Sequence, residues 1–215
     1  MKTLKIYFDT EFTDLKKDAD LISVGLIAAV DKRMPIGFYC EITDFDSGKC
    51  SKFVKDNVLP TTILPTISTE DLNVISEFKR YFNYKFNYHM LSFSKAGSEV
   101  LSWINSMVTY YGFDNVEFVA ACCSYDWVLL VDLLTNGGSS IDLPKYISPA
   151  CIDYNQVIAN AYTGGNNYDA FNLTYSDLVK DMIDKGFINI TDKLTHNSMY
   201  DAIVLYMIAS KLDNI

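Results

Sequence analysis

Three apolar segments with the length of β-strands lie within the first 42 residues, and they restrict the fold more than any other feature of the sequence. They span residues 4–8, 21–29 and 37–42. The connection DKRMP before the third segment has the charged and proline residues that favour a turn. Strands separated by such short connections usually pair with their neighbours in sequence. We therefore predict that the chain begins with a three-stranded meander.

The rest of the chain is dominated by helical patterns. Residues 116–122 form one further apolar run, which suits a buried strand. Helices are predicted over residues 70–82, 94–111, 124–138, 153–162, 174–185 and 196–212. Ser68 with Asp71 three residues later favours a helix start, and Gly112 favours a helix end. Strands followed by helices that alternate with few strands predict an α/β fold with a mixed sheet flanked by helices.

Two segments between these elements have less regular patterns. FVKDNVLPTTILPT contains two prolines, which disfavour a continuous helix. Further on, aromatic residues alternate with polar ones at a period of two, which suits a strand with its rings on one face. These aromatic residues are Phe82, Tyr84, Phe86 and Tyr88. We interpret their rings as packing in the core or against a second copy of the chain.

Length and composition favour a single ordered domain. The chain has 215 residues, 49% of them hydrophobic and 21% charged, so it can bury enough apolar surface to order one domain over residues 1–215. Its longest apolar run, residues 21–30, is interrupted by Ser23 and Gly25, which argues against a signal peptide or a membrane span. The five cysteines show no C-x-x-C spacing, and we expect free thiols in a cytoplasmic protein.

The formal charge of −9 argues against binding of a polyanion through a broad basic surface. The charge is uneven, since residues 43–95 contain seven Lys and Arg against six Asp and Glu, a net of +1, whereas the remainder holds eleven against twenty-one, a net of −10. The segment 43–95 is therefore the expected approach path for a phosphate backbone. Two bound divalent cations would move the total charge from −9 to −5.

Acidic residues follow the first apolar segment directly. Asp9 and Glu11 come after the residues KIYF, and if that strand continues, both side chains point to the same face. Two adjacent carboxylates repel each other and are costly to bury, and a divalent cation removes this penalty. The alternative is that the strand ends at Phe8 and that both acids are solvated turn residues.

Two further acids occur in comparable settings later in the chain. Asp126 lies in the first turn of the helix after the buried strand, where the helix dipole alone would also favour an acid. Asp201 lies near the start of the last helix, on its apolar side, and His196 precedes it by five residues. A lone histidine at a helix start is more often a cap or a satisfied polar residue than a base. Neither motif is decisive by itself.

Together, these motifs resemble in order and spacing the DEDD exonuclease superfamily, in the branch with a histidine five residues before the last aspartate. The resemblance implies an RNase H-like fold in which two Mg²⁺ or Mn²⁺ ions are held by Asp9, Glu11, Asp126 and Asp201. It also implies that His196 is the general base, a role that suits a side chain whose ordinary pKa lies near neutrality. Hard oxygen ligands favour these cations over zinc.

A narrower family is similar to this chain over most of its length, namely the RNase AS group of adenylate-preferring 3′-5′ exoribonucleases. The similar segments are DTEF, LISVGLIA, FVKDNVLP, VEFVAACCSYDWVLL and HNSMYDA. The resemblance implies a homodimer that hydrolyses single-stranded RNA from its 3′ end to 5′-mononucleotides. The chain departs from this family in an apparent insertion at residues 79–95, which leaves base preference and dimer contacts open.

Three residues beside the acids are candidates for contacting the substrate: Thr10, Phe12 and Trp127. Stacking of an aromatic ring on a base suits single-stranded substrates, and Phe12 is the leading candidate for the terminal base. Core packing is the alternative for Phe12 and Trp127.

Two rival functions stay open at this stage. The same metal site cleaves DNA, so a 3′-5′ DNA exonuclease of the proofreading type is the main rival. A non-catalytic nucleic-acid-binding module on the same fold is the other. Such a module would be expected to lose at least one of the four acids or the histidine, and the sequence keeps all five.

Overall fold

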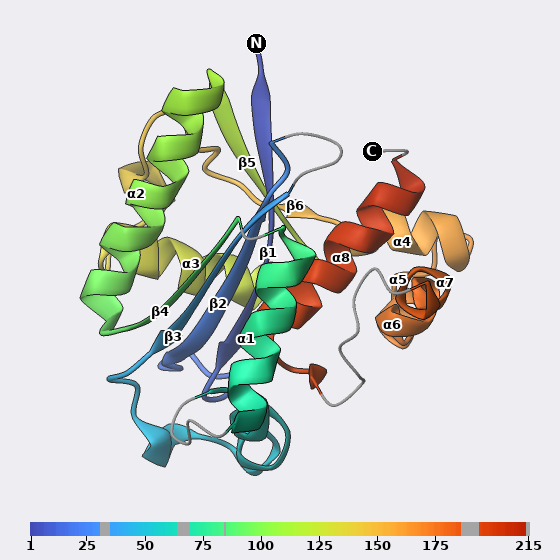
Figure 1. The fold of residues 1–215 in the computed structure, drawn as a ribbon, viewed down its shortest axis with the longest axis horizontal. Helices are drawn as coiled ribbons and strands as arrows, with labels where there is room; N and C mark the ends of the chain where they lie inside the picture. Colours follow the sequence, from blue (N-terminus) through green and yellow to red (C-terminus); the bar gives the residue numbers. More distant parts are fainter. Residues whose placement is uncertain (31–34, 64–68, 84, 186–193, 214–215) are drawn as a thin grey trace.

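A six-stranded mixed sheet with helices on both faces forms the centre of the molecule (Figure 1). The computed structural model describes residues 1–30, 35–63, 69–83, 85–185 and 194–213. The strands are β1 (Thr3–Phe12), β2 (Leu21–Ala28), β3 (Ile36–Ile42), β4 (Phe86–Leu91), β5 (Asn115–Ala120) and β6 (Ile152–Asp153). Their order across the sheet is β4-β3-β2-β1-β5-β6, so β1 lies inside the sheet with a neighbour on each side.

The first three strands form the antiparallel meander that the sequence predicts. On one side of the meander, β5 pairs parallel to β1 and β6 pairs parallel to β5. At the other edge, β4 pairs parallel to β3. Parallel pairs need crossover connections, which the intervening helices provide. The prediction of an α/β fold with a mixed sheet flanked by helices is confirmed, and the arrangement is consistent with an RNase H-like fold.

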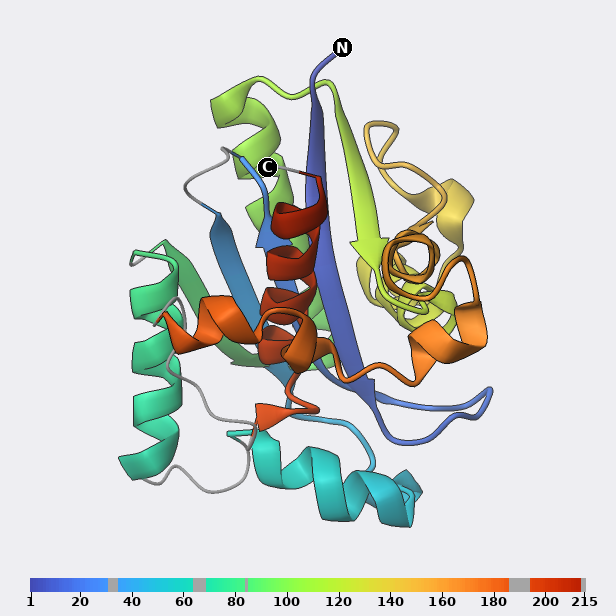
Figure 2. The same ribbon diagram turned by 90° about the vertical axis from the view of Figure 1, so that its right-hand side faces the viewer.

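Helices cover the two faces of the sheet unequally (Figures 1 and 2). One face is covered by α2 (Phe93–Tyr111) and α3 (Ser124–Thr135). The other is covered by α1 (Thr69–Tyr81), α4 (Asn155–Tyr162) and the C-terminal helix α8 (Ser198–Leu212). Three short helices pack beside α8 on this second face: α5 (Asn167–Phe171), α6 (Tyr175–Leu178) and α7 (Lys180–Asp184).

The core consists of two main apolar layers, one on each face of the sheet. On β1, Tyr7 belongs to the layer under α8, whereas its neighbours Ile6 and Phe8 belong to the layer under α2 and α3. This division follows from the alternation of side chains along a strand. All residues of β2 are buried because both of its faces are covered, which explains the nearly continuous apolar sequence LISVGLIA.

The helix α8 lies directly on the sheet because residue 25 is a glycine. Gly25 on β2 is opposite Asp9 on β1. A Cβ atom at Gly25 would lie 2.4 Å from the carbonyl oxygen of Ser198, in the first turn of α8. Only a residue without a side chain permits such a close approach. The N-terminal turn of α8 is thereby placed over the part of β1 that carries Asp9 and Glu11.

Most predicted elements are present, with differences at their ends. The helix α2 ends at Gly112, which adopts a left-handed conformation with φ of 66°. The predicted helix over residues 153–162 begins only after β6, and the one over residues 174–185 is divided at Val179 into α6 and α7. The segment with two prolines forms two short helical turns, Val54–Val58 and Leu59–Thr61. The predicted helix start at Ser68 lies outside the described residues.

The segment 79–95, which departs from the RNase AS pattern, contains the end of α1, the edge strand β4 and the start of α2. The period of two predicts the strand correctly for Phe86 and Tyr88, but Phe82 follows the end of α1, and Tyr84 lies outside the described residues. Phe82 stacks on Phe86 with ring centroids 5.5 Å apart, and Tyr88 stacks on Tyr39 at 5.6 Å. The rings of Phe82, Phe86 and Tyr88 pack against other rings of the same chain, as the core interpretation predicts, and the contact with a second copy stays a prediction.

Among the described residues, none of the helices combines the length and the apolar character that a membrane span requires. The five cysteines are free thiols, of which Cys40 and Cys50 are buried.

Candidate active site

Asp9 and Glu11 lie on one face of β1, near its carboxyl end. The strand continues to Phe12, so the alternative in which it ends at Phe8 is wrong. Residues two apart in a strand point the same way, and here they point to the face that α8 covers. Because β1 is paired on both sides, its backbone holds the two acids on a rigid part of the sheet.

Asp126 reaches the same region from the first turn of α3. Its Oδ1 atom accepts one hydrogen bond from the backbone nitrogen of Thr10, at 3.1 Å, and another from the Thr10 hydroxyl, at 2.7 Å. The helix α3 begins soon after β5, and the carboxyl ends of β5 and β1 lie at the same edge of the sheet because these strands are parallel. The topology therefore joins two residues that are 116 positions apart.

Asp201 and His196 come from the N-terminal end of α8. The N-cap of this helix is Asn197, whose side chain accepts hydrogen bonds from the backbone nitrogens of Met199 and Tyr200. Asp201 follows in the first turn, and its Oδ2 atom accepts a hydrogen bond from the backbone nitrogen of His196 at 2.9 Å. Since Asn197 performs the capping, the cap interpretation of His196 is wrong, and its imidazole lines a cavity together with the acids.

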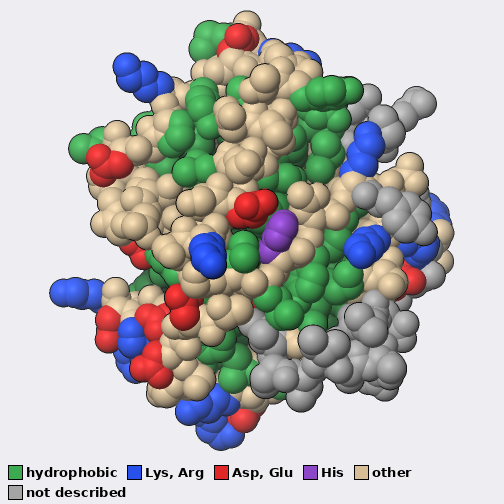
Figure 3. Space-filling model, turned by 60° about the vertical axis from the view of Figure 1, so that its left-hand side comes forward, with side chains coloured by type: hydrophobic (Ala, Val, Ile, Leu, Met, Phe, Trp, Pro, Cys, Tyr) green, Lys and Arg blue, Asp and Glu red, His purple; other side chains and the backbone are tan. Residues whose placement is uncertain are grey.

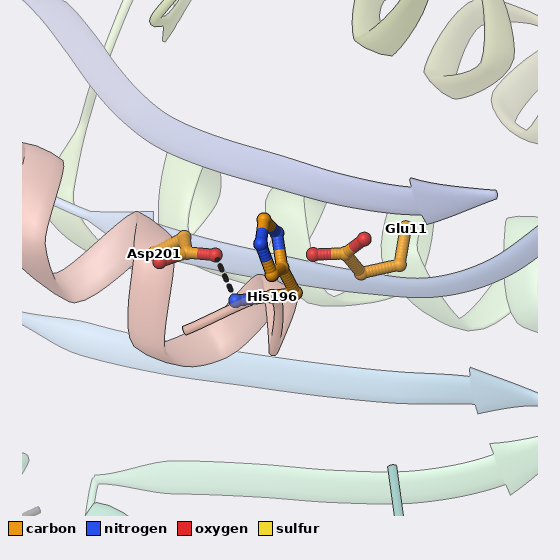
Figure 4. Close-up of side chains that lie close together, drawn as sticks. All are labelled: Glu11, His196 and Asp201. Atoms are coloured by element: carbon orange, nitrogen blue, oxygen red, sulfur yellow. Dashed lines mark hydrogen bonds between the residues drawn. The ribbon is translucent and has the colours of Figure 1, made fainter. Parts of the chain in front are cut away.

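Glu11, His196 and Asp201 are close enough to hold one metal ion. One ligand atom of each lies within 4.8 Å of the other two, and no other group of this kind occurs in the described part of the chain. The imidazole lies between the two carboxylates (Figure 4). Asp9 and Asp126 stand outside this group, although both line the same cavity. One oxygen of Asp126 is engaged by the two hydrogen bonds from Thr10.

The electrostatics of the four acids are unfavourable. Burial raises the pKa of Asp9 and Glu11 well above their usual range, and repulsion from the neighbouring acids raises both further. Burial also raises the pKa of Asp126, and it raises the pKa of Asp201 to about 7. The ion pairs between described residues all involve other acids. A divalent cation fits this donor set, because it would offset the repulsion and accept hard oxygen ligands.

The imidazole of His196 is half-buried. Its ring meets the ring of Phe53 edge to face, with centroids 5.1 Å apart and an interplanar angle of 82°. Burial lowers the pKa of His196, so the neutral form, which can accept a proton, is favoured at neutral pH.

The acids and the histidine line a cavity of about 460 Å³, a size typical of small-ligand sites. Its apolar lining consists of Phe12, Leu15, Phe53, Val54, Val58 and Phe171. A second cavity of about 480 Å³ adjoins it and shares Asp9, Phe171, His196 and Asp201. In Figure 3, acidic side chains and a histidine lie together near the centre of one face, between hydrophobic surfaces. A ligand centred on the acids would have space on both sides.

The three predicted substrate contacts have different surroundings. Thr10 is buried, and its hydroxyl is engaged by Asp126, so in this structure it positions that acid. Phe12 lines the cavity and stacks on Tyr125 with centroids 5.8 Å apart. Trp127 lines neither of the two cavities that contain the acids. Its ring packs at 5.5 Å from that of Phe118, as the core alternative predicts.

Sequence reasoning missed three apolar side chains at the rim of the cavity: Leu15, Phe53 and Phe171. They are 67%, 54% and 65% exposed, respectively, and give the rim of the cavity an apolar surface. No local pattern distinguishes them from the many buried phenylalanines and leucines of this chain.

No protein-family model matches the chain, and no curated protein sequence matches it.

Proposed function

We propose that this chain is a metal-dependent nuclease that removes nucleotides from the 3′ end of single-stranded RNA. The proposal depends on one observation: four acids with raised pKa values and one histidine line a single cavity at the carboxyl ends of β1 and β5. Titratable groups with strongly shifted pKa values in a cleft are typical of catalytic sites. The order of these residues along the chain, which resembles the DEDD exonucleases, supports the same reaction.

Each site residue has a proposed role. Asp9, Glu11, Asp126 and Asp201 would hold two Mg²⁺ or Mn²⁺ ions. When bound, these cations would supply the positive charge that activates a water molecule and stabilises a departing 3′ oxygen. His196 accepts the proton of the attacking water at an imidazole nitrogen, which its lowered pKa keeps unprotonated at neutral pH.

The apolar rim of the cavity suits a flexible strand with unpaired bases. Phe12, Phe53 and Phe171 offer rings on which bases can stack, and such stacking contributes about 1–3 kcal/mol per base. The choice of RNA, a preference for adenylate, a homodimer and a cytoplasmic location are proposed from the resemblance to the RNase AS family. A proofreading-type DNA exonuclease is the rival, because the same acids can serve either nucleic acid.

The proposal is tested by digestion of 5′-labelled homopolymer RNAs and of DNA strands with matching sequence, in the presence of Mg²⁺ or Mn²⁺. We expect a ladder that shortens one nucleotide at a time from the 3′ end of RNA, fastest for poly(A), and no digestion after addition of EDTA. The variant Asp9→Asn serves as the inactive control. Faster loss of DNA would favour the rival, and metal-independent cleavage would contradict the mechanism.

A further inference from the structure

The backbone of His196 has an unusual conformation. Its φ angle is 70°, in the left-handed region that residues with a side chain adopt only at an energetic cost. His196 precedes α8, so the regular helix does not fix its backbone. The φ angle of residue 196 therefore sets the direction in which the imidazole leaves the main chain. Some other part of the structure must therefore hold residue 196 in place.

Two hydrogen bonds hold this residue from opposite sides. Its N–H donates to Oδ2 of Asp201 at 2.9 Å. Its carbonyl oxygen lies 2.6 Å from the hydroxyl of Thr61, which donates to it from the short helical turn Leu59–Thr61. That hydroxyl is also 2.8 Å from the carbonyl oxygen of Val58, so its single proton can be shared. The bond to Asp201 comes from within the site, whereas the bond to Thr61 comes from a separate segment of the chain.

Asn197 connects the same two segments. Its Nδ2 atom donates to the carbonyl oxygen of Thr61 at 2.9 Å and to the hydroxyl of Tyr39 at 3.0 Å. Its Oδ1 atom accepts the two backbone hydrogen bonds at the start of α8. The side chain is completely buried and uses both donors and its acceptor. Loss of any of these bonds would leave a buried polar group without a partner, which is costly.

The network continues to the sheet through a buried acid. The Tyr39 hydroxyl donates to Oε1 of Glu41 at 2.5 Å, and the backbone nitrogen of Ile63 donates to the same oxygen at 2.7 Å. Tyr39 and Glu41 are on β3 and are completely buried. A continuous chain of hydrogen bonds therefore runs from β3, through residues 61–63 and Asn197, to the backbone of His196.

We propose that Thr61 and Asn197 are positioning residues that hold His196 in its left-handed conformation and so direct its imidazole to the space between Glu11 and Asp201. Thr61 acts on the carbonyl group of residue 196, and Asn197 fixes Thr61 relative to α8. Neither residue lines the cavities that contain the acids, so neither touches the reacting atoms. The predicted effect on turnover rests on the proposed nuclease function, whereas the effect on the orientation of His196 does not.

The test compares Thr61→Val, which removes the hydroxyl at nearly constant shape, with Thr61→Ser, which keeps it. The control is Thr62→Val, since the neighbouring Thr62 hydroxyl bonds the carbonyl oxygen of Leu59 and not that of His196. We expect T61V to lower kcat on 5′-labelled RNA about tenfold with little change in KM, which is the effect of losing one hydrogen bond of ordinary strength. T61S and T62V should remain within about twofold of the wild type, which is the residual expected when that bond is kept.

The second readout is the nuclear magnetic resonance spectrum of the histidine rings, which is simple because the chain has only two histidines. T61V should shift the ring signals of His196 and leave those of His89, which stacks on Phe38, unchanged. If valine prevents folding, Thr61→Ala provides the same comparison.

The two proposals fail in different ways. If the wild type has no nuclease activity, the proposed function fails, and the ring signals alone decide whether Thr61 positions His196. If the wild type is active, a wild-type kcat or unshifted His196 signals in T61V would overturn the positioning role. Equal effects of T61V and T62V on both readouts would also overturn it.

Discussion

At the scale of single residues, the site combines ionisable side chains whose burial is unfavourable without a partner. Burial raises the pKa of each of the four acids, and repulsion from neighbouring acids raises it further for Asp9 and Glu11. The imidazole of His196 lies among them, and burial lowers its pKa. The position of this ring between Glu11 and Asp201 is compatible with two roles, that of a general base and that of a metal ligand. Removal of the imidazole by substitution would distinguish the two roles.

Replacement of His196 by Ala should lower kcat by about 10²- to 10⁴-fold, which is the contribution of a general base, while the affinity for Mn²⁺ changes little. Turnover on RNA and Mn²⁺ binding by calorimetry would be measured on the same preparation. The control is His89→Phe, because His89 stacks on Phe38 away from the cavity and a phenyl ring preserves that contact. A parallel loss of Mn²⁺ affinity in H196A would instead identify His196 as a ligand.

At the scale of elements, the site depends on how closely α8 approaches β2. The helix contributes both His196, just before its start, and Asp201, in its first turn, whereas the facing acids belong to β1. The distance between these two halves of the site is set by Gly25, which has no side chain to hold the helix away.

Replacement of Gly25 by Ala should therefore displace α8 and disrupt the site. The added Cβ would lie 2.4 Å from the Ser198 carbonyl oxygen, and overpacking of this kind costs about 1–3 kcal/mol or more. We expect a lower melting temperature and a large loss of turnover even in the fraction that remains folded.

The matched control for this variant is Gly112→Ala. Gly112 has a positive φ of 66° but open space around its Cβ position, so the substitution costs only backbone strain of about 1–2 kcal/mol. It should lower the melting temperature without lowering kcat per folded molecule. Wild-type turnover in G25A would show that the approach of α8 to the sheet is not critical for the site.

At the scale of the whole molecule, the acid cluster should make stability depend on pH and on divalent cations. A carboxyl group whose pKa is higher in the folded than in the unfolded chain binds protons more tightly when folded, so the metal-free protein loses stability as pH rises. For Asp201 this loss extends from about pH 4 to about pH 7, between its ordinary pKa and its raised value. Above this range the unfavourable charge is fully present.

We therefore expect the acids to destabilise the metal-free protein less at pH 5 than at pH 7.5, as measured by thermal unfolding. Mg²⁺ or Mn²⁺ at a hundredfold excess over Kd should raise the free energy of unfolding by about 2.7 kcal/mol at pH 7.5, which corresponds to roughly 5–10 °C in Tm. The increase should be much smaller at pH 5. The variant Asp201→Asn lacks one titrating group and should show a flatter pH profile. An equal shift in Tm by the cation at both pH values would contradict a site made of these acids.

The secondary structure and the list of candidate acids could largely be predicted from the sequence. The periodicity of apolar residues located the meander, the helix from residue 94 to 111 and the apolar strand before Asp126. In each of these elements the buried residues recur at a spacing that the element's own backbone sets. The prediction was poorer where local preference and packing differ. The aromatic residue Phe82 follows a helix instead of lying in a strand, since its ring is recruited to stack on Phe86 across the turn.

By itself, the sequence determined which residues are unusual: Asp9, Glu11, Asp126 and Asp201 interrupt apolar segments, where a carboxylate needs a partner. Only the tertiary structure decided how these residues meet. The parallel pairing of β1 with β5 brought Asp126 to Thr10, and the network that holds His196 joins β3, residues 61–63 and α8. Such contacts carry no periodic signal, because they depend on which distant segments become neighbours, and that is settled by the packing of the whole sheet and its helices.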